Sequence, residues 1–143
     1  MTNPPAIATV ARNAVREQVA LRALLDGVEA AFVRSPPRTG SGPDVVAARL
    51  DTLSGPLRAH FEEIESSGIL ERIEELFPDR AELCVRLRRE HRGLLQQLDR
   101  LRTAGAIERR GGWWSAEVRA LVEELTRHEA REASLVDALG DGT

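Results

Sequence analysis

Three histidines and one glutamate are the residues of this chain that could do chemistry together. His60, His91 and His128 each stand where the surrounding helical pattern calls for an apolar side chain, and Glu132 follows His128 by one turn on the same face. Such a seam takes two positions in seven, so three of three histidines fall on it by chance about one time in forty. Imidazole nitrogens and carboxylate oxygens suit iron, zinc and manganese. The pattern therefore indicates a metal site inside a helical core.

The elements that must position these residues are helices. Apolar residues at spacings of three and four predict four long helices at about residues 6–32, 44–66, 79–102 and 114–139, and a short one at about 69–77. Proline and glycine in 34–43 and three glycines in 103–112 predict the connections. Pro56 predicts a kink or a restart of the second helix, with Ser54 as its cap. Short connections favour an antiparallel, up-down-up-down four-helix bundle, all-α, as a single domain over 1–143.

Counting along these helices predicts that the polar residues meet at one height. In the first antiparallel pair, Glu17 and His60 both lie about 24 Å from the end that their helices share. In the second pair, His91 and His128 lie about 17 and 20 Å from their shared end. Glu17, with Gln18 beside it, interrupts the apolar stripe of the first helix, and a buried carboxylate needs a cation, a donor or a metal nearby. We therefore expect one polar layer across the bundle.

Composition excludes several classes of function. The formal net charge is −3, the basic residues are all arginine, and no basic stretch with interleaved aromatics is present, so nucleic acid is not an expected partner. A single cysteine, Cys84, lies on the apolar seam and predicts a buried hydrophobe. No leader pattern or membrane-length apolar run is evident, so we expect a cytoplasmic protein without a membrane partner. No serine or cysteine nucleophile sits beside a histidine on a shared seam and no phosphate-binding loop is present, which predicts a binding protein rather than an enzyme.

Three blocks of sequence resemble a known family. LRAHFEEIESSGIL, LRREHRGLLQQLDRL and LTRHEAREASLVDAL are similar, in order and spacing, to the bacterial hemerythrin-like (HHE cation-binding) domain. The resemblance implies a four-helix bundle with a non-haem iron centre held by histidines and carboxylates, which binds dioxygen or supports responses to nitric oxide or iron. It also implies that His60, His91 and His128 are ligands and that Glu132 is a carboxylate ligand.

Four other ligand places of that family are changed in this chain, to Gln18, Ile64, Leu95 and Ala133. We therefore expect one ion rather than two, namely iron, with zinc or manganese as alternatives. The expected ligands are the residues His60, His91, His128 and Glu132, with Glu17 or Glu63 as additional ligands. An open position on the ion would accept a small diatomic ligand, O2 or NO.

A metal-free interpretation has equal weight. Core histidines are often satisfied by a nearby carboxylate, and His91 against Glu132 or His128 against Glu17 would form such a network. The chain would then be a four-helix interaction or scaffold module without a cofactor. Some residues near the site are predicted to have no part in it: three glutamates read as solvated surface and two tryptophans as plugs of the bundle end, namely Glu62, Glu65, Glu90, Trp113 and Trp114.

Overall fold

The part of the chain that the structure describes is helical. The computed structural model describes residues 7–34 and 42–141, and no strand occurs in these ranges. The elements are α1 (Ile7–Arg34), α2 (Gly42–Ser66), α3 (Ile69–Leu76), the 3-10 turn η1 (Pro78–Arg80), α4 (Ala81–Arg102), α5 (Ala106–Arg109) and α6 (Gly112–Asp141). The predicted all-α class is confirmed. None of the described helices combines the length and the hydropathy that crossing a membrane would require.

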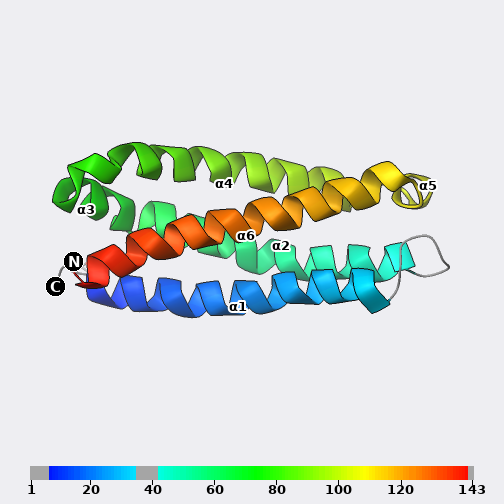
Figure 1. The fold of residues 1–143 in the computed structure, drawn as a ribbon, viewed down its shortest axis with the longest axis horizontal. Coiled ribbons are helices and arrows are strands. Elements are labelled where there is room, and N and C mark those ends of the chain that lie inside the picture. Colours follow the sequence, from blue (N-terminus) through cyan, green and yellow to red (C-terminus); the bar gives the residue numbers. More distant parts are fainter. Residues whose placement is uncertain (1–6, 35–41, 142–143) are drawn as a thin grey trace.

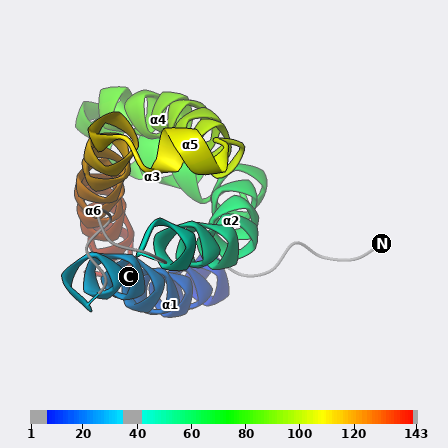
Figure 2. The same ribbon diagram turned by 90° about the vertical axis from the view of Figure 1, so that its right-hand side faces the viewer.

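The four long helices lie side by side. In Figure 1 each of α1, α2, α4 and α6 runs in the direction opposite to the long helix before it. The view along the long axis shows α1 next to α2 and α6, with α4 on the far side of the common core (Figure 2). Contacts join α1 to α2, α2 to α4, α4 to α6, and α6 back to α1. Each long helix therefore turns one face toward the interior, and the chain packs around a shared core.

A polar layer divides that core into two apolar parts. One apolar cluster contains Leu21, Leu57, Leu94 and Leu125, and the other contains Ala14, Ile64, Leu87 and Leu135. On every long helix the change from one cluster to the other falls at the position of the polar residues. The buried polar side chains of this layer are His60, His91, His128 and Glu132.

Several details of the helices differ from the sequence-based prediction. The second helix continues through Pro56 without a restart, and Ser54 is not a cap: its hydroxyl is buried and accepts hydrogen bonds from Arg58 and Arg102. The predicted 103–112 connection contains the short helix α5, and the fourth long helix begins two residues early, at Gly112. Residues 35–41 of the predicted first connection lie outside the described residues.

Only one of the two adjacent tryptophans, Trp114, is buried at the end of the core, whereas two were predicted. Trp114 is fully buried, and its indole N–H donates to the carbonyl of Leu101 at 3.0 Å. Trp113 is half exposed, and the guanidinium of Arg100 lies over its ring, 5.4 Å from the ring centroid. Neighbouring helix positions point about 100° apart, so the two rings cannot both face the core. The end of the core is therefore closed by Trp114.

Candidate metal centre

The polar layer is built by one side chain from each of three helices and a fourth from the next turn. His60 on α2, His91 on α4 and His128 on α6 are each at most 2% exposed, and Glu132 on α6 is 1% exposed. Each follows or precedes a buried leucine or isoleucine by three or four residues, which is the spacing of one helix face. The local helical pattern therefore forces these polar groups inward, where they must be satisfied by one another.

Glu132 is the hub of the layer. One carboxylate oxygen, Oε1, accepts hydrogen bonds from Nε2 of His60 and, at 3.1 Å, from the side-chain amide of Gln18. The other oxygen, Oε2, lies 3.4 Å from Nε2 of His128 and 3.9 Å from Nε2 of His91. All three imidazoles thus turn the same ring nitrogen, Nε2, toward one carboxylate.

The opposite ring nitrogens face a second set of carboxylates. Nδ1 of His60 lies 2.6 Å from Glu17, Nδ1 of His128 lies 3.4 Å from Glu90, and Nδ1 of His91 lies 3.7 Å from Glu65. At His128 the carboxylate of Glu90 accepts a hydrogen bond from Nδ1, which holds the proton on that nitrogen and leaves the Nε2 lone pair free to point inward. Glu65 faces Nδ1 of His91 from the same outer side without a hydrogen bond. Histidines that bind metals are oriented in this way in most known sites. The arrangement therefore suits ligands better than packing residues.

An aromatic ring fixes two of the imidazoles. Phe61 is stacked on His91, with ring centroids 4.1 Å apart and planes 14° apart. Its edge meets His128 at 5.2 Å, and the rings of His91 and His128 lie 4.8 Å apart. Because Phe61 is buried and holds both rings, neither imidazole can turn away from Glu132 without opening the core.

The inner atoms of this half of the layer have no hydrogen-bond partner among the described residues. They are Nε2 of His91, Nε2 of His128 and Oε2 of Glu132, and they lie within 4.8 Å of one another. Two donors that share a tetrahedral ion at about 2.1 Å lie about 3.4 Å apart. Oε2 of Glu132 lies 3.4 Å from Nε2 of His128 and 3.9 Å from Nε2 of His91, which is close to that value. Buried and unpaired donors at such distances fit a metal ion.

The part of the layer around His60 is stabilised by a protonated imidazole in the metal-free protein. Burial alone would lower the pKa of His60, but its hydrogen bond to Glu132 and the charges of Glu132 and Glu129 outweigh burial and raise that pKa to about 9. His60 is then an imidazolium near neutral pH and donates to both Glu17 and Glu132. Burial alone would raise the pKa of Glu132, yet the imidazoles of His128, His60 and His91 hold it well below its usual range.

Glu129 is a member of the cluster that sequence reasoning missed. It is one of three donors in a second possible group, with His60 and Glu132, and its Oε2 lies 3.9 Å from Nε2 of His60. Burial, and next the charge of Glu132, raise the pKa of Glu129 to about 7. Glu129 lies four residues after buried Leu125 and three before Glu132, so a wider helical stripe would have included it.

The structure assigns different surroundings to the predicted ligands. His91, His128 and Glu132 come together as one group, whereas His60 belongs to the group on the other oxygen of Glu132. Glu17 is 34% exposed and lies on the outer nitrogen of His60, not on His128. Glu63 is half-buried on α2 and belongs to neither of the two groups of described donors.

Two of the glutamates read as surface have partners in the layer. Glu90 is only 18% exposed and forms an ion pair with Arg131 besides facing His128, so its reading as solvated surface was wrong. Glu65 is about half exposed and faces His91. Glu62 is exposed, as expected. These partners come from other helices than the histidines they face, which spacing along one helix cannot reveal.

Comparison of the chain with known protein families, with curated proteins and with solved structures finds no match.

Proposed function

We propose that this protein binds a divalent transition-metal ion in its core, through Nε2 of His91, Nε2 of His128 and Oε2 of Glu132. The observation that carries the proposal is the direction of the imidazoles. Each Nε2 faces Glu132 and each Nδ1 faces an outer carboxylate, while the inner donors of His91 and His128 lack hydrogen bonds among the described residues. Leaving such groups buried and unpaired costs about 1–3 kcal/mol each, which an ion would offset.

The donor set narrows the kind of ion. Two imidazoles and one carboxylate suit iron, zinc or manganese rather than calcium or magnesium. Three protein ligands leave at least one position open, which is where a small diatomic ligand such as O2 or NO would bind. We propose iron as the resident ion and an antiparallel four-helix bundle of the hemerythrin-like type as its scaffold. The resemblance of the three histidine blocks supports this choice.

His60 has a distinct role in this proposal. Its imidazolium balances the charge of Glu132 and fixes Oε1, so that Oε2 remains directed at His91 and His128. Gln18 supports the same oxygen from α1 with a neutral amide. These contacts favour one ion over two in the protein at neutral pH, because the imidazolium carries the positive charge that a second ion would bring.

The direct test is the metal content of the purified protein and its titration with Fe²⁺, Mn²⁺ and Zn²⁺. We expect one ion per chain, loss of binding in Glu132→Gln, and unchanged binding in the matched control Glu63→Gln. His91→Ala and His128→Ala should also lose the ion. A wild-type protein that takes up none of the three metals would reject the proposal.

A metal-free interaction or scaffold module is the second candidate. It is favoured by the hydrogen bonds of His60, which satisfy both ring nitrogens with Glu17 and Glu132 and need no ion. This candidate predicts that a chelator leaves the melting temperature unchanged. A metal present at a hundred times its dissociation constant would instead stabilise the fold by about 2.7 kcal/mol. A fall of several degrees in the melting temperature on chelation would therefore exclude the metal-free scaffold.

A further inference from the structure

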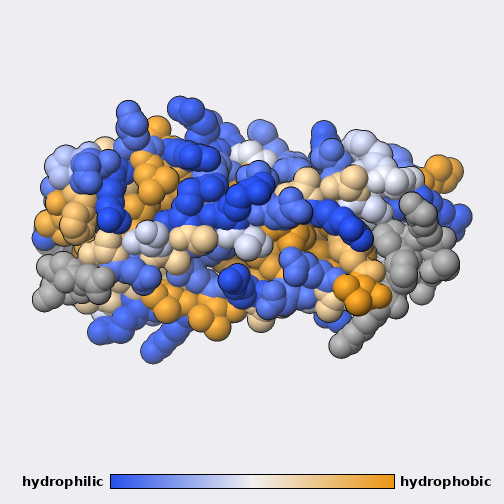
Figure 3. Space-filling model, viewed as in Figure 1, coloured by the Kyte–Doolittle hydropathy of each residue, from blue (hydrophilic) through white to orange (hydrophobic). Residues whose placement is uncertain are grey.

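A groove between α1 and α6 leads from the surface to the polar layer. It has a volume of about 420 Å³, and its walls include Val15, Val19 and Leu25 from α1 and the small Ala130 and Ala133 from α6. On the face of the molecule that carries α1 and α6, apolar surface shows between charged side chains (Figure 3). Alanines on α6 leave room that larger side chains would fill.

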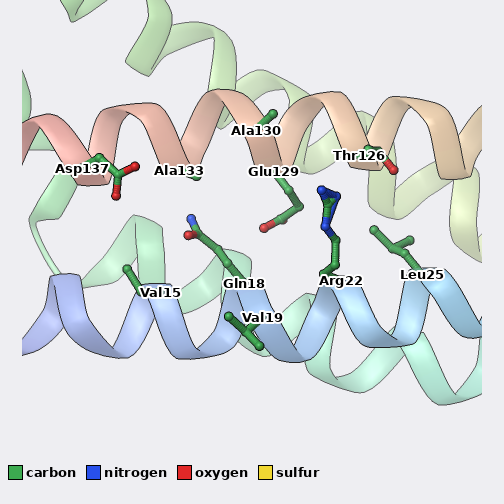
Figure 4. A pocket seen from close by; sticks show the side chains of 10 residues that line it. All are labelled: Val15, Gln18, Val19, Arg22, Leu25, Thr126, Glu129, Ala130, Ala133 and Asp137. Carbon is green, nitrogen blue, oxygen red and sulfur yellow. The ribbon is translucent and has the colours of Figure 1, made fainter.

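Two polar side chains lie where the groove meets the layer. Gln18 extends from α1 toward α6, and Glu129 extends from α6 toward α1 (Figure 4). Gln18 donates to Oε1 of Glu132, and Oε2 of Glu129 lies 3.9 Å from Nε2 of His60. A group that enters the groove and reaches Glu129 is therefore one side chain away from Glu132.

Paired groups lie in every seam between the long helices at the height of the layer, including the hydrogen bond from Gln18 to Glu132 between α1 and α6. Glu17 is hydrogen-bonded to His60 between α1 and α2, and Phe61 is stacked on His91 between α2 and α4. Between α4 and α6, Glu90 is paired with Arg131. Glu129 differs from these groups, because neither of its buried oxygens has a hydrogen-bond partner within residues 7–34 and 42–141.

We propose that the groove between α1 and α6 is the entrance through which a divalent cation reaches the core, and that Glu129 is the carboxylate that takes the cation before Glu132 does. The inference rests on the proposed metal site. The buried oxygens of Glu129 accept no hydrogen bond from a described residue, and the imidazolium of His60 lies 3.9 Å away, so an arriving cation supplies a closer partner. Gln18 lines the groove beside Glu129 and donates to Oε1 of Glu132, so Oε2 remains the oxygen that can bind the cation. Arg22 and Asp137 also line the groove and carry opposite charges, so they do not give its mouth a net charge.

A residue at an entrance and a metal ligand affect different measured quantities when they are substituted. Obstructing an entrance raises the barrier for binding and for release alike, so both rates fall by the same factor and the dissociation constant stays unchanged. Removing a ligand mainly raises the dissociation constant or lowers the number of ions bound. The ratio of the two rates therefore separates the roles for Glu129.

The test is the rate of Zn²⁺ uptake by the metal-free full chain, followed by stopped flow with a chromophoric zinc indicator, and the rate of release to an excess of chelator. In Glu129→Gln, which keeps the side-chain shape, we expect the uptake rate to fall about tenfold, the lower end of electrostatic effects on association rates. The release rate should fall by the same factor, because both directions cross the same barrier. Ala133→Leu, which fills the groove, should slow both rates as well. The matched controls on α6 are Glu123→Gln and Ala120→Leu, both at exposed positions, and both should keep wild-type rates.

Each outcome has one meaning. Wild-type rates in both Glu129→Gln and Ala133→Leu would overturn the entrance while leaving the metal site intact. A weaker affinity or a smaller number of ions in Glu129→Gln would make Glu129 a ligand and would also overturn the entrance. A wild-type protein without zinc binding would instead reject the proposed function. Helical circular dichroism of each variant checks that it folds, and Glu129→Gln carries the test if Ala133→Leu does not.

Discussion

His60 and Glu132, 72 positions apart in the chain, form a hydrogen bond at the centre of the core. The other nitrogen of the same ring lies 2.6 Å from Glu17, so the His60 imidazolium is satisfied on both sides. The remaining oxygen of Glu132 faces His91 and His128 without a hydrogen bond to any described residue. Glu132 therefore divides the layer into two parts. On the side of Oε1 the hydrogen bonds of protonated His60 satisfy the polar groups, and on the side of Oε2 the unpaired donors suit a metal cation. The first two predictions follow from this division.

The metal-free protein should lose stability as the pH rises from about 6.5 to 9. The pKa of His60 is raised to about 9, so the stability it contributes is complete below its unfolded value of 6.5 and is lost as the pH passes 9. A shift of this size corresponds to about 3 kcal/mol. The raised pKa of Glu129, about 7, acts in the same direction from pH 4.5 upward, because the fold disfavours its ionised form.

In the acidic range, stability should change with pH in the opposite direction. The pKa of Glu132 is lowered, so its contribution is present above 4.5 and is lost as the pH falls below that value. Urea unfolding in the presence of a chelator, from pH 4 to pH 10, should therefore give a maximum at about pH 4.5 to 5, where the gain from Glu132 is almost complete and the loss from Glu129 begins. His60→Gln should flatten the alkaline decline. A wild-type free energy of unfolding that is constant from pH 6.5 to 9 would contradict the imidazolium at His60.

Glu90→Gln should weaken metal binding without removing a ligand. The carboxylate of Glu90 lies 3.4 Å from Nδ1 of His128 and is held in place by Arg131. Carboxylates behind a metal-binding histidine contribute about 10- to 100-fold in affinity, and we expect the lower value because this contact is long. The control is Glu82→Gln, an exposed glutamate in the first turn of the same helix. Competition titration with a zinc indicator measures both variants, and equal affinities would exclude a role for Glu90.

The helical period predicted the inner half of the site. His60, His91, His128 and Glu132 were found because each replaces an apolar residue on a helix face, and a helix face is set by the local sequence. The matched heights followed from the rise per residue and the short connections. The predicted restart at Pro56 was wrong because a proline removes a single backbone hydrogen bond, and packing of the long α2 on both sides of it outweighs that loss.

The outer half depends on distances between helices. Glu65 and Glu90 reach His91 and His128 across two interhelical seams, and Glu17 faces His60 rather than His128 because α1 packs against α2 at that height. These pairings change with small rotations of each helix, which spacing along one chain segment does not determine. The division of the ligands between the two oxygens of Glu132 has the same origin, since Nε2 of His60 reaches Oε1 whereas Nε2 of His91 and of His128 face Oε2.

The hydrogen bond of Trp114 offers a stability prediction away from the site. Its indole N–H donates to the carbonyl of Leu101 in the last turn of α4, one of the carbonyls that the helix itself leaves unpaired. Trp114→Phe removes that donor and keeps an aromatic ring in the core, so we expect a loss of about 1 kcal/mol in urea unfolding. Trp113→Phe, at the half-exposed neighbour, should change stability by less than about 0.5 kcal/mol. Equal losses of unfolding free energy in the two variants would contradict the conclusion that Trp114 alone closes the end of the core.

Gly68 and Gly93 should respond to alanine with opposite signs. Gly68 joins α2 to α3 with a φ of +85°, and a Cβ there would meet nothing within 4 Å, so any penalty comes from the left-handed backbone alone. We expect Gly68→Ala to cost about 1 kcal/mol. Gly93 lies exposed in the middle of α4, where a Cβ also meets nothing, so Gly93→Ala should stabilise the helix by up to about 1 kcal/mol. Urea unfolding of both variants measures the difference, and a shift of the same sign in both would show that backbone conformation does not govern the α2–α3 turn.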